Sequence, residues 1–113
     1  MSVFNGLFPI LPGREDAARN LAQELLGPRR DDYNAFQARS AFTRETWALQ
    51  PTPAGLFMNV WFEGNVEHGF ADLATAQDDF TVWFRAQLLD ITGIDLSAPM
   101  DAPPPEIVFD WTA

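Results

Sequence analysis

Asn59 and Trp61 are the residues whose types and spacing point most directly to chemistry. They lie two positions apart in the run GLFMNVWFEG, residues 55–64, so in a β-strand their side chains share one face. An amide among apolar neighbours needs partners, because leaving its hydrogen bonds unmade costs about 1–3 kcal/mol. Two interpretations follow: Asn59 lines a pocket with Trp61, or it bridges backbone or water at an interface between subunits.

Arg44 is a second candidate, in the alternating run AFTRETWALQ of residues 41–50. The alternation predicts a strand with Thr43, Glu45, Trp47 and Leu49 on one face and Phe42, Arg44, Thr46 and Ala48 on the other. A guanidinium directed into a cavity could hold a carboxylate or phenolate ligand through paired hydrogen bonds. A charge directed into a lumen would need a partner, which Glu63 or Asp110 could supply across the sheet. The alternative is an ion pair at the rim of the dimer interface.

His68 is the only histidine, and histidine titrates near neutral pH. It falls in the first turn of a short helix expected after Asn65, which is a favourable N-cap residue. The alternative to a functional role is a solvent-exposed histidine beside a helix cap. The sequence contains no HExxH motif, clustered metal ligands, phosphate-binding glycine loop or nucleophile elbow. Metal hydrolysis and nucleotide chemistry are therefore disfavoured, and we expect no metal site.

The composition predicts one globular domain over residues 1–113. The hydrophobic fraction is 47%, and the chain has no cysteine, so disulfides and thiolate chemistry are excluded. A net charge of −9 argues against binding to nucleic acid or to an anionic membrane surface. No signal peptide or run of about 20 apolar residues is evident. We therefore expect a cytoplasmic protein.

The elements that must position these residues form an α+β pattern. Strands are expected at residues 3–11, 41–50, 55–64 and 106–112. Helical segments are expected at 14–26, 29–40, 65–74 and from Thr75, in a capping box with Asp78, to Gly93. A proline-rich connector at 98–105 precedes the last strand, which either completes the sheet of its own chain or extends onto a partner. The order predicts a ferredoxin-like βαββαβ fold, with a four-stranded antiparallel sheet and the helices on one face.

Large apolar residues occur on both faces of two predicted strands. In residues 55–64, one face carries Leu56, Met58, Val60 and Phe62, while the other carries Phe57 and Trp61 around Asn59. Helices can cover only one face, and an uncovered second face would exceed the apolar patch of an ordinary monomer. A second copy packed sheet on sheet would cover it. We therefore expect a homodimer.

The chain resembles a small bacterial family of uncharacterised function within the dimeric α+β barrel superfamily. The resemblance rests on LPGRED, RRDDYNAF, RETWAL, GLFMNVWFEG and FTVWFRAQLLDITGIDL. It implies a barrel pocket for a small apolar or aromatic molecule, and activities ranging from cofactor-free monooxygenase to none. By analogy with those monooxygenases, Asn59 and Trp61 would hold substrate and oxygen without a cofactor. The pocket would also be lined by Phe57, Trp47 and Arg44.

Two alternatives to a small-molecule pocket with monooxygenase-like chemistry stay open. Haem-degrading relatives carry an Asn on the first strand, a Trp on the third and a haem-ligating His, which Asn5, Trp61 and His68 would match. The shorter separation of Trp61 and His68 disfavours this reading. The remaining alternative is a noncatalytic dimeric module whose aromatic lumen is an interface core.

Overall fold

Three strands and four helices follow one another in the computed structural model, which describes residues 2–99 and 103–113. Their bounds are β1 (Ser2–Pro9), α1 (Glu15–Leu26), α2 (Arg30–Arg39), β2 (Arg44–Thr52), β3 (Gly55–Gly64), α3 (Val66–Thr75) and α4 (Asp79–Thr92). The α+β class is confirmed. The order is βααββαα, which differs from the predicted βαββαβ because the helical segments are divided and the fourth strand is not formed.

β3 is the central strand of an antiparallel sheet in the order β1-β3-β2. Asn59 lies between Leu7 of β1 and Ala48 of β2, so all three side chains share one face. The predicted hairpin between β2 and β3 is confirmed. Its turn is fixed by Thr52, whose hydroxyl donates to the Gly55 carbonyl (2.8 Å) and accepts from the Ala54 N–H (3.1 Å).

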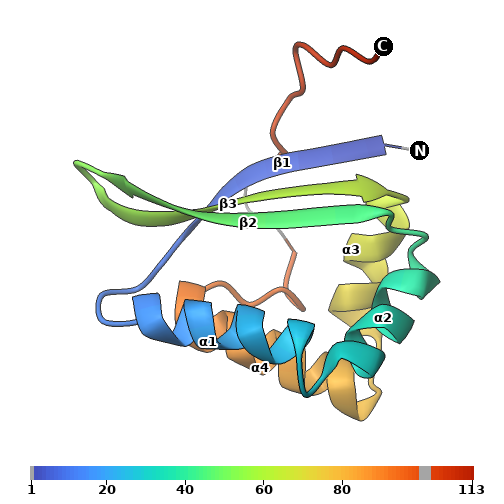
Figure 1. Cartoon of the computed structure of the whole chain (residues 1–113), viewed down its shortest axis with the longest axis horizontal. Helices are drawn as coiled ribbons and strands as arrows, with labels where there is room; N and C mark the ends of the chain where they lie inside the picture. The colour runs from blue at the N-terminus through green and yellow to red at the C-terminus, as the bar shows by residue number, and fades with distance from the viewer. Residues whose placement is uncertain (1, 100–102) are drawn as a thin grey trace.

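All four helices lie on one side of the sheet and leave the other side open (Figure 1). On β3, Met58, Val60 and Phe62 face the helices and are buried, whereas the residues between them are only half-buried. The core joins the buried side of the sheet to one stripe of each long helix: Phe4, Met58, Val60 and Phe62 meet Leu21, Leu25, Phe36, Phe84, Leu88 and Ile91. The predicted division of β3 into two faces is confirmed.

α4 begins one turn later than the capping box predicted. Its N-cap is Asp78, whose carboxylate accepts hydrogen bonds from the Thr81 N–H (3.1 Å) and hydroxyl (2.8 Å). Thr75 is the last residue of α3, and its hydroxyl donates to the Ala71 carbonyl (2.7 Å). Gly93 ends α4 at φ 74°, a left-handed conformation that glycine adopts without a Cβ clash.

Arg85 ties α4 to the end of α3. Its Nη1 donates to the carbonyls of Leu73 (2.8 Å) and Ala76 (2.6 Å). The last carbonyls of a helix have no partner within the helix, and a cation there also complements the helix dipole. The half-buried Arg85 guanidinium of α4 therefore caps the C-terminal end of α3.

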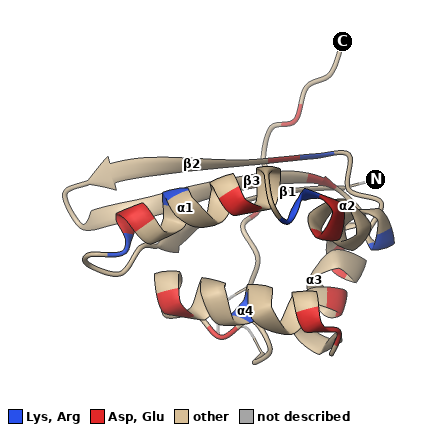
Figure 2. Ribbon diagram, turned by 60° about the horizontal axis from the view of Figure 1, so that its bottom comes forward, with Lys and Arg blue, Asp and Glu red and all other residues tan. Residues whose placement is uncertain are grey.

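Acidic side chains lie on all four helices, so the outer surface of the helix layer is negative (Figure 2). The open side of the sheet carries one charge of each sign at one end of β2 and β3, from Arg44 and Glu63, which lie opposite each other in the register. Within the four helices, nine acidic residues outnumber four arginines, and the C-terminal arm carries two further acids, Glu106 and Asp110.

The prediction that residues 106–112 form a strand of this sheet is wrong. Residues 103–113 have no regular secondary structure and are exposed. The Pro105 ring lies at the middle of β1, with its Cγ 3.3 Å from the position that a Cβ on Gly6 would occupy. Pro103, Pro104 and Pro105 have no N–H to donate to a strand, and the chain turns away from the sheet after them (Figure 1). Within the described residues, the outer edge of β1 is unpaired.

Candidate functional site

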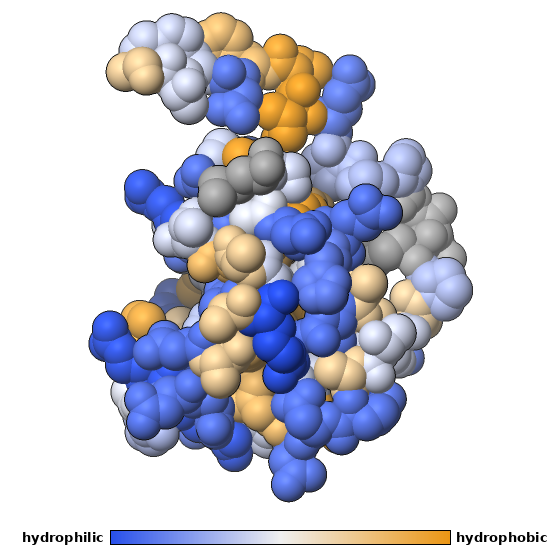
Figure 3. Space-filling model, turned by 90° about the vertical axis from the view of Figure 1, so that its right-hand side faces the viewer, coloured by the Kyte–Doolittle hydropathy of each residue, from blue (hydrophilic) through white to orange (hydrophobic). Residues whose placement is uncertain are grey.

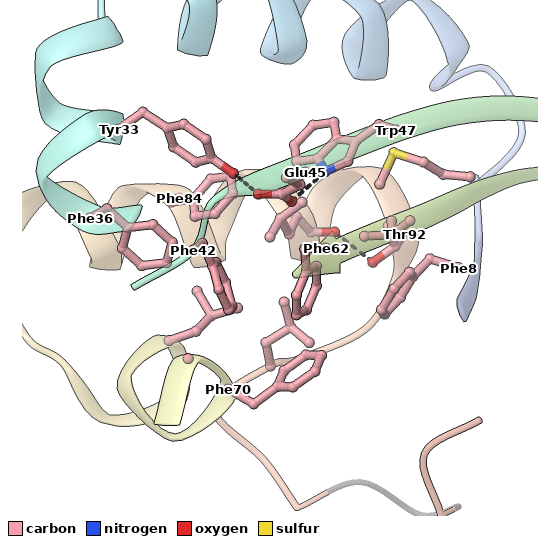
Figure 4. A pocket seen from close by; sticks show the side chains of 16 residues that line it. Phe8, Tyr33, Phe36, Phe42, Glu45, Trp47, Phe62, Phe70, Phe84 and Thr92 are labelled. Atoms are coloured by element: carbon pink, nitrogen blue, oxygen red, sulfur yellow. Dashed lines mark hydrogen bonds between the residues drawn. The ribbon is translucent and has the colours of Figure 1, made fainter. Parts of the chain in front are cut away.

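A pocket lies between the covered side of the sheet and the helices, and we call it the inner pocket (Figure 4). The centre of a water-sized molecule can occupy about 60 Å³ of it, which is room for a few waters or a small ligand. Rings and aliphatic side chains form most of its wall: Phe8, Tyr33, Phe36, Phe42, Glu45, Trp47, Met58, Val60, Phe62, Gly69, Phe70, Leu73, Phe84, Leu88, Thr92 and Leu96.

Glu45 is the one charged residue in that wall. Its Oε1 accepts hydrogen bonds from the Tyr33 hydroxyl and from Gln37 Nε2 (2.5 Å), and its Oε2 accepts from Trp47 Nε1 (2.6 Å). Tyr33 and Gln37 lie one turn apart on α2, so they present their polar groups together. A carboxylate offers about four lone-pair positions. Three are occupied here, which leaves one for a donor on a ligand.

The surroundings of Glu45 change its acidity. Burial raises the pKa of Glu45, although the hydrogen bonds from Tyr33, Trp47 and Gln37 work in the opposite direction. Burial also raises the pKa of Tyr33 well above its ordinary value, and the nearby carboxylate of Glu45 adds to this. A carboxylate with a raised pKa is a stronger base than an exposed one. Glu45 is therefore suited to accept a hydrogen bond or a proton.

Aromatic packing holds these polar groups in place. The Trp47 ring stacks parallel to Phe84, with centroids 6.4 Å apart, and the Tyr33 ring meets Phe84 edge to face at 5.7 Å. Such packing fixes the rotamers on which the hydrogen bonds depend. Gln37 Oε1 is buried without a hydrogen-bond partner among the described residues, so the polar end of the site is not fully satisfied.

Tyr33, Glu45 and Trp47 also line a second hollow, on the outside of the molecule. There they are joined by Ala22, Leu25 and Leu26 of α1, around a volume of about 170 Å³. The same three side chains thus stand between this outer groove and the inner pocket.

The open side of the sheet has its own hollow, which brings together four of the predicted site residues. Asn5, Arg44, Asn59 and Trp61 line a volume of about 410 Å³ together with Thr46, Ala48 and Glu63. Trp61 Nε1 donates to Glu63 Oε2 (3.0 Å). We call this the open-face hollow. It is wider and more polar than the inner pocket.

The other predicted site residues lie elsewhere, so one pocket lined by Phe57, Asn59, Trp61 and Trp47 does not exist. Trp47 is in register with the buried Val60, which places its ring on the helix side of the sheet. Phe57 shares the open side with Asn59 but lies outside the wall of the hollow.

His68 belongs to neither hollow. It lies in the first turn of α3, where it is exposed. Its backbone N–H donates to the Asn65 side chain (3.2 Å), which confirms Asn65 as the N-cap. The three residues of the predicted haem site are therefore separated. Asn5 and Trp61 line the open-face hollow, and His68 lies outside it.

Glu45, Tyr33 and Gln37 were not among the predicted site residues. One signal for Glu45 was present in the sequence, since the alternation of β2 placed this carboxylate on the same face as Trp47 and Leu49. A carboxylate on an apolar face requires partners. Tyr33, the only tyrosine, shares a helical period with Phe36, but nothing in the spacing indicated that α2 would bring it to β2.

Comparisons of the chain with protein-family models, curated proteins and solved structures found no match. In residues 2–99 and 103–113, no three His, Asp or Glu side chains are grouped so that they could hold a metal ion. No helix in the same residues is long and apolar enough to cross a membrane.

Proposed function

We propose that the protein binds a small apolar or aromatic molecule in the inner pocket, with one hydroxyl or similar donor of the ligand directed to Glu45. A single observation supports this most strongly: an otherwise apolar wall contains one carboxylate that still has an acceptor position free. Binding sites for small molecules commonly combine an apolar lining with a few placed polar groups.

The carboxylate would supply selectivity more than affinity. Apolar burial drives binding of any ligand that fits the rings of the pocket. A molecule without the donor would leave Glu45 desolvated and one lone pair unmatched, so such a ligand would be rejected. Glu45 is also placed to take a proton from the ligand. Proton abstraction, the reaction that this site supports best, is the step on which any oxidation of a phenol here would depend.

Phenol and toluene test the proposal, because they have nearly the same shape and differ in the hydroxyl donor. In calorimetric titrations we expect phenol to bind at least ten times more tightly than toluene. The Glu45→Gln variant should lose most of this preference. Glu63→Gln is the matched control, since Glu63 also accepts from a tryptophan two residues away but lies on the open side. Equal affinities in the unmodified chain would contradict the proposal.

A variant that fills the inner pocket gives an independent test. Leu73 is a half-buried residue of its wall, so Leu73→Trp should abolish phenol binding. Leu89 is 45% exposed on α4, and Leu89→Trp adds the same ring outside the pocket. Unchanged binding in a folded Leu73→Trp variant would place the ligand elsewhere.

A homodimer formed through the open side of the sheet is the second proposal, and it is compatible with the first. Leu7 is 55% exposed there, and Phe57 and Trp61 are only half-buried. The helix side is acidic, so two copies would repel each other less through their open sides. Introduction of a charge by Ala48→Arg should weaken the dimer in sedimentation equilibrium, whereas Ala86→Arg on the exposed side of α4 should not.

A further inference from the structure

We propose that the C-terminal arm, residues 103–113, is exchanged between two copies of the chain and lies on the open side of the other copy's sheet. The inference rests on the proposed homodimer and goes beyond it, because it assigns an occupant to the open-face hollow. Four features of the arm support it: its exposed apolar residues, its point of departure, its reach and its charges.

The arm exposes apolar side chains that its own copy does not cover. Ile107, Val108, Phe109 and Trp111 are 37%, 83%, 82% and 74% exposed. Single exposed apolar residues are ordinary, but four within five positions form a continuous patch. The arm stands clear of the body, and its apolar atoms are directed to solvent (Figure 3). We therefore expect these side chains to be buried against another protein surface.

The point of departure prevents the arm from adding a full strand to its own sheet. Pro105 packs at Gly6, in the middle of β1. From Gly6 only four positions remain towards Ser2 and three towards Pro9, whereas residues 106–112 number seven. The arm instead continues past β1 to the side away from the helices (Figure 1). This is the side on which a second copy would sit.

The reach of the arm is sufficient for exchange. Seven extended residues span about 23 Å, and packed sheets are separated by about 10 Å. An arm that starts at the edge of one sheet can therefore cross to the facing sheet and still lie along it. The triple proline stiffens its base, so less conformational entropy is lost when the arm is fixed.

The charges also fit. Arg44 is exposed on the open side, and none of the described carboxylates lies within 4 Å of its guanidinium. The arm carries Glu106 and Asp110 between its apolar residues. Each copy has one arm and one open-face hollow. In a two-fold dimer, each arm therefore fills the hollow of the other copy, and no arm or hollow remains exposed. A different partner protein would leave one arm exposed for each hollow that it filled.

Cysteine cross-linking tests the exchange in the full chain, which has no cysteine of its own. A Val108→Cys chain is mixed with an Ala48→Cys chain and treated with a short bismaleimide. We expect a covalent product that joins one chain of each kind. The matched control replaces Ala48→Cys with Ala86→Cys on α4, which should give little mixed product. Equal yields from the two mixtures would overturn the inference.

A second measurement separates the arm from the dimer itself. Sedimentation equilibrium should show that Phe109→Ser combined with Trp111→Ser weakens dimerisation at least tenfold, whereas Leu89→Ser on α4 leaves it unchanged. An unaltered dimer in the arm variant would overturn the exchange and leave the homodimer standing. A full chain that is monomeric at high concentration would overturn both.

Discussion

The phenol of Tyr33 donates a hydrogen bond to the carboxylate of Glu45, and this contact joins α2 to β2 at the wall of the inner pocket. Trp47 and Gln37 complete the set of donors around the same carboxylate. The contact matters because it keeps an acidic side chain beside aromatic rings, where an unpartnered carboxylate would be strongly disfavoured.

Replacement of Glu45 by glutamine should change how stability depends on pH. Burial raises the pKa of Glu45 above its ordinary value of 4.5, so the unfolded chain loses this proton first as the pH rises. The folded state then holds more protons, and the free energy of unfolding falls with rising pH from about 4.5 through the folded pKa. Glu45→Gln should remove this fall. The check is urea unfolding of both proteins at several pH values from 4 to 8.

Other carboxylates do not obscure that comparison. Burial pushes the pKa of Asp78 upward, but hydrogen bonds from Thr81 and the nearby charge of Arg39 leave it lowered. Asp78 therefore stabilises the folded state above its ordinary pKa of 3.8 and loses this effect as the pH falls further. It is present in both proteins, so it cancels in their difference. Identical pH profiles for the two proteins would mean that the Glu45 carboxyl is solvated.

The ultraviolet titration of Tyr33 should show an ionisation midpoint above 10. Its pKa is raised by burial and by the charge of Glu45, and it is the only tyrosine in the chain. Absorbance at alkaline pH therefore reports on it alone. In Glu45→Gln the midpoint should move down, because the negative neighbour is gone. The same midpoint in native and urea-unfolded protein would contradict the buried contact.

Gly69→Ala should destabilise the fold, although alanine normally favours a helix over glycine. A Cβ at residue 69 would lie 2.4 Å from Cζ of the Phe42 ring, which therefore has to shift. Overpacking of this kind costs about 1–3 kcal/mol, and chemical denaturation would measure it. Phe42→Leu removes the ring edge, so the two changes combined should cost less than the sum of the single ones. Additive costs would show that the ring is not the obstacle.

Arg85→Met should cost about 2 kcal/mol, because it removes two charge-assisted hydrogen bonds to carbonyls at the end of α3. Arg19→Met is the control. It breaks only an exposed ion pair with Asp16, which is worth less than about 1 kcal/mol. Thermal or urea unfolding distinguishes the two. Equal, small losses would mean that the cap from Arg85 contributes little.

The sequence allowed the core to be predicted but not the main candidate site. β3 was predicted with its bounds and its two faces, because glycines bracket the run and buried residues alternate within it. The N-cap role of Asn65 was also predictable, since the preference of Asn for that position is local. Such features depend on neighbours within a few positions along the chain.

The Tyr33–Glu45 contact depends instead on how α2 turns into β2. Ala41, between them, adopts φ 53°, a left-handed conformation that is uncommon for alanine and not indicated by the sequence. The arm was misplaced for a related reason. Its β-branched and aromatic residues are typical of a strand, but the packing of Pro105 against Gly6 directs it away from β1.

Isotope-filtered nuclear Overhauser contacts of bound phenol test the central claim most directly. Binding in the inner pocket predicts contacts from the phenol ring to side chains of Phe62, Phe70 and Trp47, and loss of these contacts in Leu73→Trp. Contacts to Asn59 and Trp61 instead would place the ligand in the open-face hollow. That result would contradict the account given for Glu45.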